Sequence, residues 1–444
     1  MHQMNYFASS SSLLTYTVLQ LQDKGTMEHP VPDWLSSEFL KQCLQQEHGY
    51  EDIEITKFTA SPAISVREQY SSCPIRVKIE YRKHNGSDEL RSLSLVLKSE
   101  RKRGAVKEVI DSFESSESTF YKSFIPKTFS LTNIPFAAKS YYSPQLSVIV
   151  LEDLREKGFI MGDKRNGLDF EHCRLFVAAA ASLHAASLAV LEEDPKLINI
   201  VGKEKMFVCG QAVTPGLQRM VSCALRCLAE YTETSDRFNK YTDLIMGCSN
   251  NILETVVEAV KVRKDEFNTM NHGDGWNNNM MFRYNDEGLP CEVRLLDFQY
   301  TRYASPVTDI VYFIWASAND DVRSHRIDEL YTFFVDEINK NLKHLNRSER
   351  LSHEEVRVVV KRLRPLGLFV VVSLQIFIGE KIPENIKAFF TKGREEECYQ
   401  IYKLAFSNEE YRQNRLPKLV QQLELAGIFE YLESAKRSSS KQEY

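Results

Sequence analysis

The sequence lacks the features that assign a chain to several specialised classes of protein. Its nine cysteines are scattered and include no CxxC pair, which argues against a disulfide framework and against a zinc site. No stretch approaches the roughly 18 to 20 consecutive apolar residues of a membrane span. Basic residues are not in excess, since 56 Lys and Arg face 61 Asp and Glu. We therefore expect reduced thiols, a cytoplasmic location, and no nucleic-acid or membrane partner.

The N-terminal segment lacks the marks of a targeting sequence. Residues 1–26 contain no arginine, which a transit peptide would need, and no basic segment or clean cleavage site typical of a signal peptide. They show no apolar periodicity either, so we expect a disordered extension that ends before Met27. The Ser/Lys/Gln-rich residues 437–444 are expected to fray.

What is present is an ordinary globular composition, 43% hydrophobic and 26% charged, with enough apolar material for a large core. Residues 27–154 resemble a β-rich lobe with one helix at 105–123. The expected strands span 53–61, 74–83, 90–99 and 147–154. Residues 155–436 are helix-rich and are interrupted by a hairpin at 280–285 and 291–298. The pattern predicts an α+β chain with a small antiparallel N-lobe and a large α-helical C-lobe.

Three polar residues around the predicted hairpin carry the strongest chemical signal. Asp274 is followed five residues later by Asn279, and Asp297 ends a strand 18 residues beyond. Asp274 alone could be a turn or cap residue, and His272 and Asn277 could be plain loop residues. Together, however, the spacing is that of phosphoryl-transfer catalysis in kinases. Asn279 and Asp297 offer the hard oxygen ligands that Mg²⁺ prefers, and Asp274 could orient an acceptor hydroxyl and take its proton.

Several motifs extend this pattern over most of the chain. They are HGDGWNNNMMF (272–282), LLDFQ (295–299), VLEDL (150–154), LVLKSE (95–100) and SPVTDIVYF (305–313). Together they resemble the ecdysteroid kinase-like family of insects and other invertebrates, which is related to choline kinases and aminoglycoside phosphotransferases. The resemblance implies a protein-kinase-like fold with ATP and Mg²⁺ in the cleft between two lobes.

The resemblance also implies roles for residues of the N-lobe. Lys98 would contact the α and β phosphates of ATP. Glu117 would pair with Lys98 from the following helix, although Glu114 competes for that role. The backbone of the segment Glu152, Asp153 and Leu154, which links the lobes, would hold the adenine.

Three further positions have roles or departures in the family pattern. Asp309 would brace the catalytic loop, or it could be an Asp favoured by a helix N-terminus. His184 is expected to be a core histidine with one satisfied nitrogen rather than a catalytic group. The loop that covers the phosphates departs from the pattern, because Arg67 stands where relatives have glycine. Ser71 and Ser72 are left to bind the phosphates through hydroxyl and N–H groups.

The sequence thus predicts a small-molecule kinase that transfers phosphate from ATP to a hydroxyl of an organic acceptor. Residues 360–444 contain no Asp, and their 14 Lys and Arg outnumber 11 Glu, so no acidic cluster awaits a cation such as choline. The apolar run 366–378 is either a buried core helix or one wall of a pocket for a neutral acceptor, with Ser373 or Gln375 orienting its hydroxyl. An ecdysteroid-like steroid or a hydroxylated xenobiotic fits this pattern. A pseudokinase that binds nucleotide or a lipophilic ligand without turnover, and a choline or ethanolamine kinase, remain alternatives.

Overall fold

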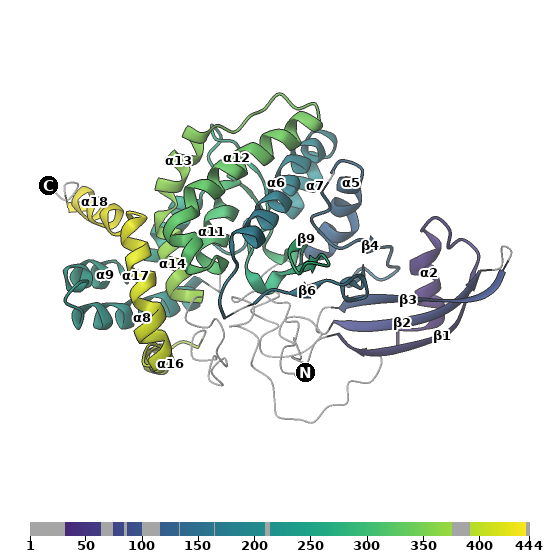
Figure 1. Cartoon of the computed structure of the whole chain (residues 1–444), viewed down its shortest axis with the longest axis horizontal. Helices are drawn as coiled ribbons and strands as arrows, with labels where there is room; N and C mark the ends of the chain where they lie inside the picture. The colour runs from purple at the N-terminus through teal and green to yellow at the C-terminus, as the bar shows by residue number, and fades with distance from the viewer. Residues whose placement is uncertain are drawn as a thin grey trace.

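The computed structural model describes residues 32–63, 74–83, 87–99, 116–132, 134–163, 165–208, 214–374 and 391–440. The predictions made for residues 1–26, Arg67, Ser71, Ser72, Glu114, Gln375 and the end of the tail lie outside these residues. Figure 1 shows a sheet at one end of the molecule, a helical mass at the other, and a small hairpin between them.

The N-lobe is a five-stranded sheet with the order β1-β2-β3-β5-β4. Its strands are β1 (Ile53–Pro62), β2 (Ile75–Lys83), β3 (Ser87–Ser99), β4 (Ser140–Tyr141) and β5 (Val148–Glu152), and every pairing is antiparallel. The predicted strands therefore all form. The last ends two residues early, because Asp153 caps a short 3₁₀ turn, η3 (Leu154–Lys157).

One face of this sheet is covered by α2 (Ser37–Gln45), whose N-terminus is capped by the Ser36 side chain. Alternate residues of β2, among them Val77 and Ile79, point toward the buried Phe39 and Leu40 of the helix and form a core separate from that of the C-lobe. The opposite face of the sheet is left to contact the C-lobe.

The helix predicted at 105–123 extends farther than expected. Its described part runs through α4 (Glu117–Thr119), a π turn, η2 (Phe120–Phe124), and α5 (Ile125–Phe129). Pro126 does not end the helix, because it lies in the first turn of α5, where proline is tolerated since no helical partner is needed for its missing N–H.

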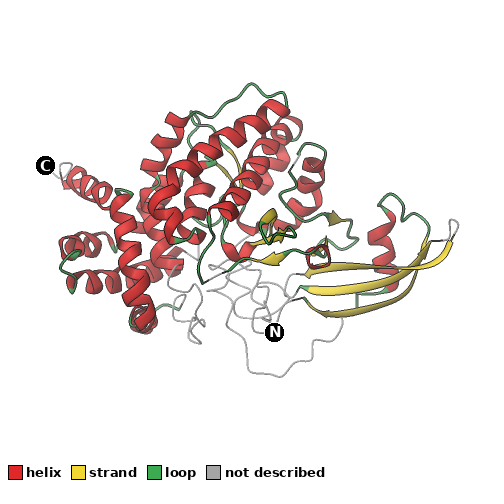
Figure 2. Ribbon diagram, in the orientation of Figure 1, coloured by secondary structure: helices red, strands yellow, loops and turns green. Residues whose placement is uncertain are grey.

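The C-lobe, which is mostly helical (Figure 2), contains α6 (Phe170–Glu193), a helix buried on nearly every side. By length and composition α6 could cross a membrane, so the prediction that no stretch approaches such a span is wrong for this helix. However, 72% of its most apolar window is buried inside the protein, as in the core helix of a soluble protein. It lies against α12 (Ile327–His344), β7 (Thr269–Asn271) and β9 (Pro290–Leu295).

The C-lobe also contains the following elements. The helices are α7 (Pro195–Val201), α8 (Thr214–Glu233), α9 (Thr242–Cys248), α10 (Ile252–Val260), α11 (Val307–Ser317), α13 (His353–Arg362), α14 (Arg364–Leu374), α16 (Glu395–Phe406), α17 (Leu416–Leu425) and α18 (Ile428–Ser440), with shorter turns η4 (Asn239–Tyr241), η5 (Asn277–Asn279), η6 (Phe298–Tyr300), η7 (Val322–Arg326) and η9 (Tyr411–Arg415). The strands are β6 (Ile160–Met161), β8 (Met280–Tyr284) and β10 (Arg302–Ala304). Hairpin β8–β9 pairs with β6, and β7 pairs with β10.

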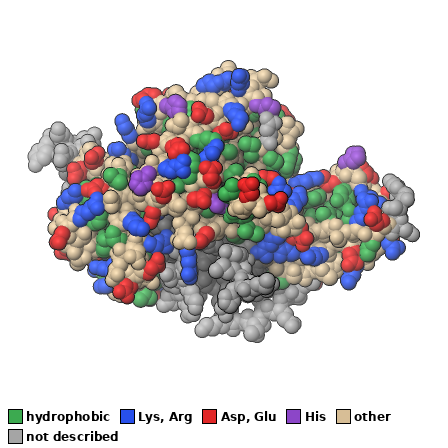
Figure 3. All heavy atoms as spheres, in the orientation of Figure 1, with side chains coloured by type: hydrophobic (Ala, Val, Ile, Leu, Met, Phe, Trp, Pro, Cys, Tyr) green, Lys and Arg blue, Asp and Glu red, His purple; other side chains and the backbone are tan. Residues whose placement is uncertain are grey.

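The structure tests the predicted hairpin and the apolar run 366–378. The hairpin forms as predicted, but its second strand ends at Leu295 rather than at residue 298. Residues 365–374 of α14 are all buried, as the core-helix alternative expects. Figure 3 shows charges of both signs interspersed over the described surface of the face drawn, in keeping with the small net charge.

Candidate active site

A cleft lies between the N-lobe sheet and the β6–β8–β9 hairpin of the C-lobe. Its apolar lining comes from both lobes and includes Ala63, Val96, Leu151, Met281 and Leu296. At its inner end the lining becomes charged, with Lys98, Glu117 and Asp297. A flat apolar group could lie between the lobes, with an anionic group toward the charged end.

Lys98 joins the two lobes at this charged end. Its Nζ donates to Glu117 Oε1 at 2.7 Å and to Asp297 Oδ1 at 2.8 Å. The ion pair with Glu117 that the sequence predicts is therefore present. Burial alone would lower the pKa of Lys98, but the two carboxylates outweigh it and raise that pKa, so the ammonium stays charged. A fixed cation at this point suits a phosphate group.

Asp297 has an unusual backbone conformation. Its φ of 63° lies in the left-handed region, which a residue with a side chain seldom adopts. This turn ends β9 early and places the carboxylate at the lobe interface, 3% exposed. Such strain is retained mostly where a side chain has to be presented in a particular direction.

Asp274 lies fully buried below the cleft, in the loop between β7 and η5. Its Oδ1 accepts a hydrogen bond from the Tyr312 hydroxyl at 2.8 Å, and its Oδ2 accepts one from Asn279 Nδ2 at 2.8 Å. Burial and the nearby carboxylate raise the pKa of Tyr312, so the hydroxyl remains a donor. The two bonds hold the carboxylate in one orientation.

Asp309, at the start of α11, braces the same loop. Its two oxygens accept hydrogen bonds from the backbone N–H groups of His272 (2.6 Å) and Gly273 (2.9 Å). Burial alone would raise the pKa of Asp309, but hydrogen bonds, including one from His184, hold it below its usual value. His184 is a buried histidine with one satisfied nitrogen, as expected, because its Nε2 lies 3.2 Å from Asp309 and its Nδ1 has no partner among the described residues.

His272 is more than a plain loop residue. Its Nε2 donates to the Leu296 carbonyl at 2.8 Å, which joins the catalytic loop to the residue before Asp297. Burial lowers the pKa of His272, so the ring is neutral near pH 7. The Leu296 N–H in turn donates to the Asn279 carbonyl at 2.8 Å, and this bond keeps Asn279 beside Asp297.

The residues present fit a bound magnesium ion. Asn279 turns its Nδ2 toward Asp274, and this leaves its Oδ1 buried with no hydrogen-bond partner in the described part of the chain. A buried oxygen without a donor is costly unless a ligand completes it. An amide oxygen and the nearby Asp297 carboxylate are the oxygen ligands that Mg²⁺ takes in proteins.

The acidic side chains of the segment that links the lobes are hydrogen-bonded within the N-lobe. Asp153 accepts hydrogen bonds from Arg76 Nε at 2.6 Å and Ser94 Oγ at 2.7 Å, and Glu152 accepts one from the Lys139 N–H at 2.8 Å. Among the described residues nothing accepts the Leu154 N–H, which leaves a backbone donor beside the apolar part of the cleft. This geometry agrees with the expectation that backbone groups, not the acidic side chains, would hold an adenine.

Comparison with known proteins decides the family. The sequence pattern of the ecdysteroid kinase-like family matches residues 66–347, well over half of the chain. The chain belongs to this family. Membership implies a small-molecule kinase that uses ATP, and together with the two-lobed architecture it confirms the predicted fold class.

Two solved structures are similar to the family member described here. They are a choline kinase LicA from Streptococcus pneumoniae (12% identity, TM-score 0.30, covering 87% of this chain and 98% of that one) and a choline/ethanolamine kinase family protein from Mesorhizobium loti (10% identity, TM-score 0.30, 87% and 99%). No curated protein matches the sequence significantly. The substrate is therefore argued from the chain's own residues.

Sequence reasoning missed two residues of the site. Tyr312 lies three residues after Asp309, so both fall on one face of α11, and this spacing could have suggested that both contact the catalytic loop. Arg76 lies in β2, and no sequence signal linked it to Asp153, 77 residues away.

A substitution at Gly273 would show how tightly the loop that carries Asp274 is packed. Its φ is 82°, and a Cβ at this position would lie 1.9 Å from the Tyr300 carbonyl oxygen. We expect Gly273→Ala to lower the melting temperature by several degrees and the catalytic rate by at least about tenfold, because the loop must move away from Tyr300.

Gly288→Ala is the matched control for this change. Gly288 also has a positive φ, of 77°, but an added Cβ would meet nothing within 4 Å. Both substitutions thus introduce backbone strain, but only Gly273→Ala also introduces a steric clash with Tyr300. Equal losses in both variants, measured by thermal melting and initial rates, would show that contact with Tyr300 does not matter.

Proposed function

We propose that this family member is an ATP- and Mg²⁺-dependent phosphotransferase that acts on a hydroxyl of a neutral, lipophilic alcohol, of the class of ecdysteroid-like steroids or hydroxylated xenobiotics. The observation that carries the proposal is that Lys98 and Asp297 line one end of an apolar cleft, while the buried Asn279, whose carbonyl accepts from the Leu296 N–H next to Asp297, holds Asp274 by a hydrogen bond. Each part needed for positioning and charge neutralisation in phosphoryl transfer has a candidate residue there.

The mechanism follows from what each side chain can do. Lys98 holds the α and β phosphates, with Glu117 fixing its position. Asn279 Oδ1 and Asp297 would hold Mg²⁺, which when bound supplies positive charge for the phosphates. Asp274 orients the acceptor hydroxyl. As the acceptor oxygen bonds to the γ-phosphorus and the bond to ADP breaks, the hydroxyl proton passes to the Asp274 carboxylate.

Asp274 is better suited to alignment than to strong base catalysis. It takes the proton late, when bonding to phosphorus has already made the acceptor oxygen acidic. The bonds from Tyr312 and Asn279 fix its direction, so the hydroxyl meets the γ-phosphate in one geometry.

Charge supports a neutral acceptor over a cationic one. Residues 360–444, which follow the metal-binding segment and supply α14, α16, α17 and α18, contain no Asp and slightly more basic than acidic residues. A quaternary ammonium group would need carboxylates or an aromatic cage.

The test is incubation of the full chain with ATP, Mg²⁺ and either a set of hydroxylated steroids and lipophilic alcohols or choline, followed by intact-mass detection of phosphorylated product. We expect product from at least one neutral alcohol, little from choline, and none with Asp274→Asn. Turnover of choline alone would favour the choline kinase alternative. ATP binding without any product would favour the pseudokinase.

A further inference from the structure

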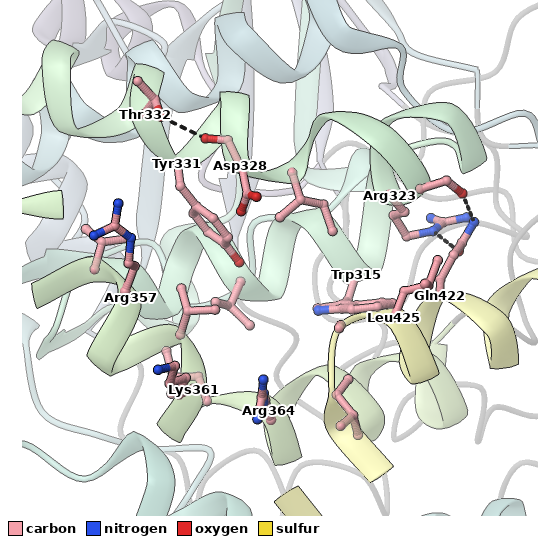
Figure 4. Close-up of a pocket in the computed structure, with 18 of the residues that line it drawn as sticks. Trp315, Arg323, Asp328, Tyr331, Thr332, Arg357, Lys361, Arg364, Gln422 and Leu425 are labelled. Carbon is pink, nitrogen blue, oxygen red and sulfur yellow. Dashed lines mark hydrogen bonds between the residues drawn. The ribbon is translucent and has the colours of Figure 1, made fainter. Parts of the chain in front are cut away.

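A second cavity, of about 600 Å³, lies in the C-lobe away from the nucleotide cleft. It is lined by residues of α11, η7, α12, α13, α14, α17 and the start of α18 (Figure 4). On α11, Val311 and Trp315 line the cavity, whereas Asp309 and Tyr312 contact the catalytic loop. At 100° per residue the two pairs point in directions about 110° apart around the helix. The cavity is therefore distinct from the site of phosphoryl transfer and shares one helix with it.

One part of the cavity is apolar. Trp315 forms one end, and the walls are completed by Val356, Val360, Leu425 and Ile428. The indole gives a flat surface suited to a ring system. A volume of 600 Å³ lies within the range of small-molecule sites.

The other part is basic. Lys361 and Arg364 lie side by side on the wall formed by α13 and α14, facing Tyr331 of α12 across the cavity (Figure 4). Within the described chain, neither Lys361 nor Arg364 has an acidic partner, and the Tyr331 hydroxyl has no hydrogen-bond partner. The other two arginines of the lining differ, because Arg323 is bonded to Asp320 and Arg357 pairs with Glu354.

Arg364 is held in place by a neighbouring turn. Gly427, between α17 and α18, has a φ of 67°, and a Cβ there would lie 2.5 Å from Arg364 Nη2. The guanidinium thus packs against a backbone that has room for it only because residue 427 is glycine. A half-buried guanidinium kept beside a cavity without a carboxylate is suited to a ligand's anionic group.

We propose that this cavity is a second ligand site, which binds an amphipathic organic anion: a ring system against Trp315, with a phosphate, sulfate or carboxylate group between Lys361, Arg364 and the Tyr331 hydroxyl. Asp328, which also lines the cavity beside Tyr331, limits the amount of negative charge that this end of the cavity accepts. The site selects for charge at one end and an apolar body at the other.

The test is isothermal titration of the full chain with 1-naphthyl phosphate, with 1-naphthol as its neutral counterpart and inorganic phosphate as its head group alone. Mg²⁺ and ADP are present throughout to occupy the nucleotide cleft. We expect 1-naphthyl phosphate to bind at least about tenfold more tightly than either partial ligand, because each supplies only one of the two contacts.

Variants locate the binding. Lys361→Gln removes an exposed charge without disturbing the fold, and the double change with Arg364→Gln removes both cations. We expect at least about tenfold weaker binding for each charge removed. Lys340→Gln is the control, since Lys340 is an exposed lysine of α12 paired with Glu337 outside the cavity.

Three results would overturn the proposal. They are equal affinity for 1-naphthyl phosphate and 1-naphthol, unchanged affinity in both Lys361→Gln and the double variant, or an equal loss in Lys340→Gln. Because only binding is measured, these outcomes do not depend on whether the chain phosphorylates an alcohol.

Discussion

Asp297→Asn is expected to lower the rate of phosphoryl transfer by at least about a thousandfold, equivalent to about 4 kcal/mol of transition-state stabilisation. The change removes a negative charge that the Lys98 ammonium now contacts at 2.8 Å, and with it the only carboxylate assigned to Mg²⁺. The amide keeps nearly the same shape, so we expect the melting temperature to change little. Steady-state rates and thermal melting measure the two effects.

The second measurement on this variant is Mg²⁺-dependent nucleotide binding by titration calorimetry. We expect Mg²⁺ to strengthen ADP binding to the unmodified chain and to have little effect on the variant. Asp286→Asn makes the same chemical change at an exposed turn of the β8–β9 hairpin and serves as the control. A rate near that of the unmodified chain would contradict the proposed metal site.

Asp274→Asn is expected to lower the catalytic rate by about 10²–10⁴-fold, the usual contribution of a positioned proton acceptor. An amide cannot take the hydroxyl proton, and its NH₂ group would face a donor, either Tyr312 or Asn279, where the carboxylate now accepts from both. The effect should fall on kcat, while the affinity for ATP remains close to its original value, because no nucleotide-binding role is assigned to Asp274.

The same Asp286→Asn control applies to Asp274→Asn. Tyr312→Phe separates the two functions of the carboxylate, since it removes one aligning hydrogen bond and keeps the proton acceptor. We expect its rate to lie between those of the unmodified chain and Asp274→Asn. Near-normal turnover by Asp274→Asn would exclude this residue as the acceptor of the proton.

The sequence predicted well what is local in the chain. Asp274, Asn279 and the β8–β9 hairpin lie in one continuous stretch, so their spacing along the chain carries the geometry of the loop. The strands of the N-lobe also formed where alternation and turn residues placed them, since each buries one face against α2 or the C-lobe.

The sequence could not predict contacts between distant elements or local strain. The bond between Arg76 and Asp153 depends on how two strands meet at the lobe junction, and neither residue has a pattern that reveals its partner. The early end of β9 follows from the left-handed conformation of Asp297, which no propensity favours for Asp in a strand. The cavity beside Trp315 is assembled from η7 and six α-helices, none of which suggests it alone.

The bond between Lys98 and Asp297 also has a consequence for biosynthesis. It joins residues 199 positions apart, one from each lobe. All five strands of the N-lobe sheet, together with Glu117, precede Asp297 in the chain, so the ribosome releases them while Asp297 is still untranslated. A nascent chain can therefore fold its sheet and pair Lys98 with Glu117. The cleft, however, lacks the residues that line its C-lobe side until the β8–β9 hairpin has emerged. During synthesis the cleft-facing side of the sheet is consequently exposed for longer than any other apolar surface of the N-lobe, and this is the interval in which a chaperone would have most to protect.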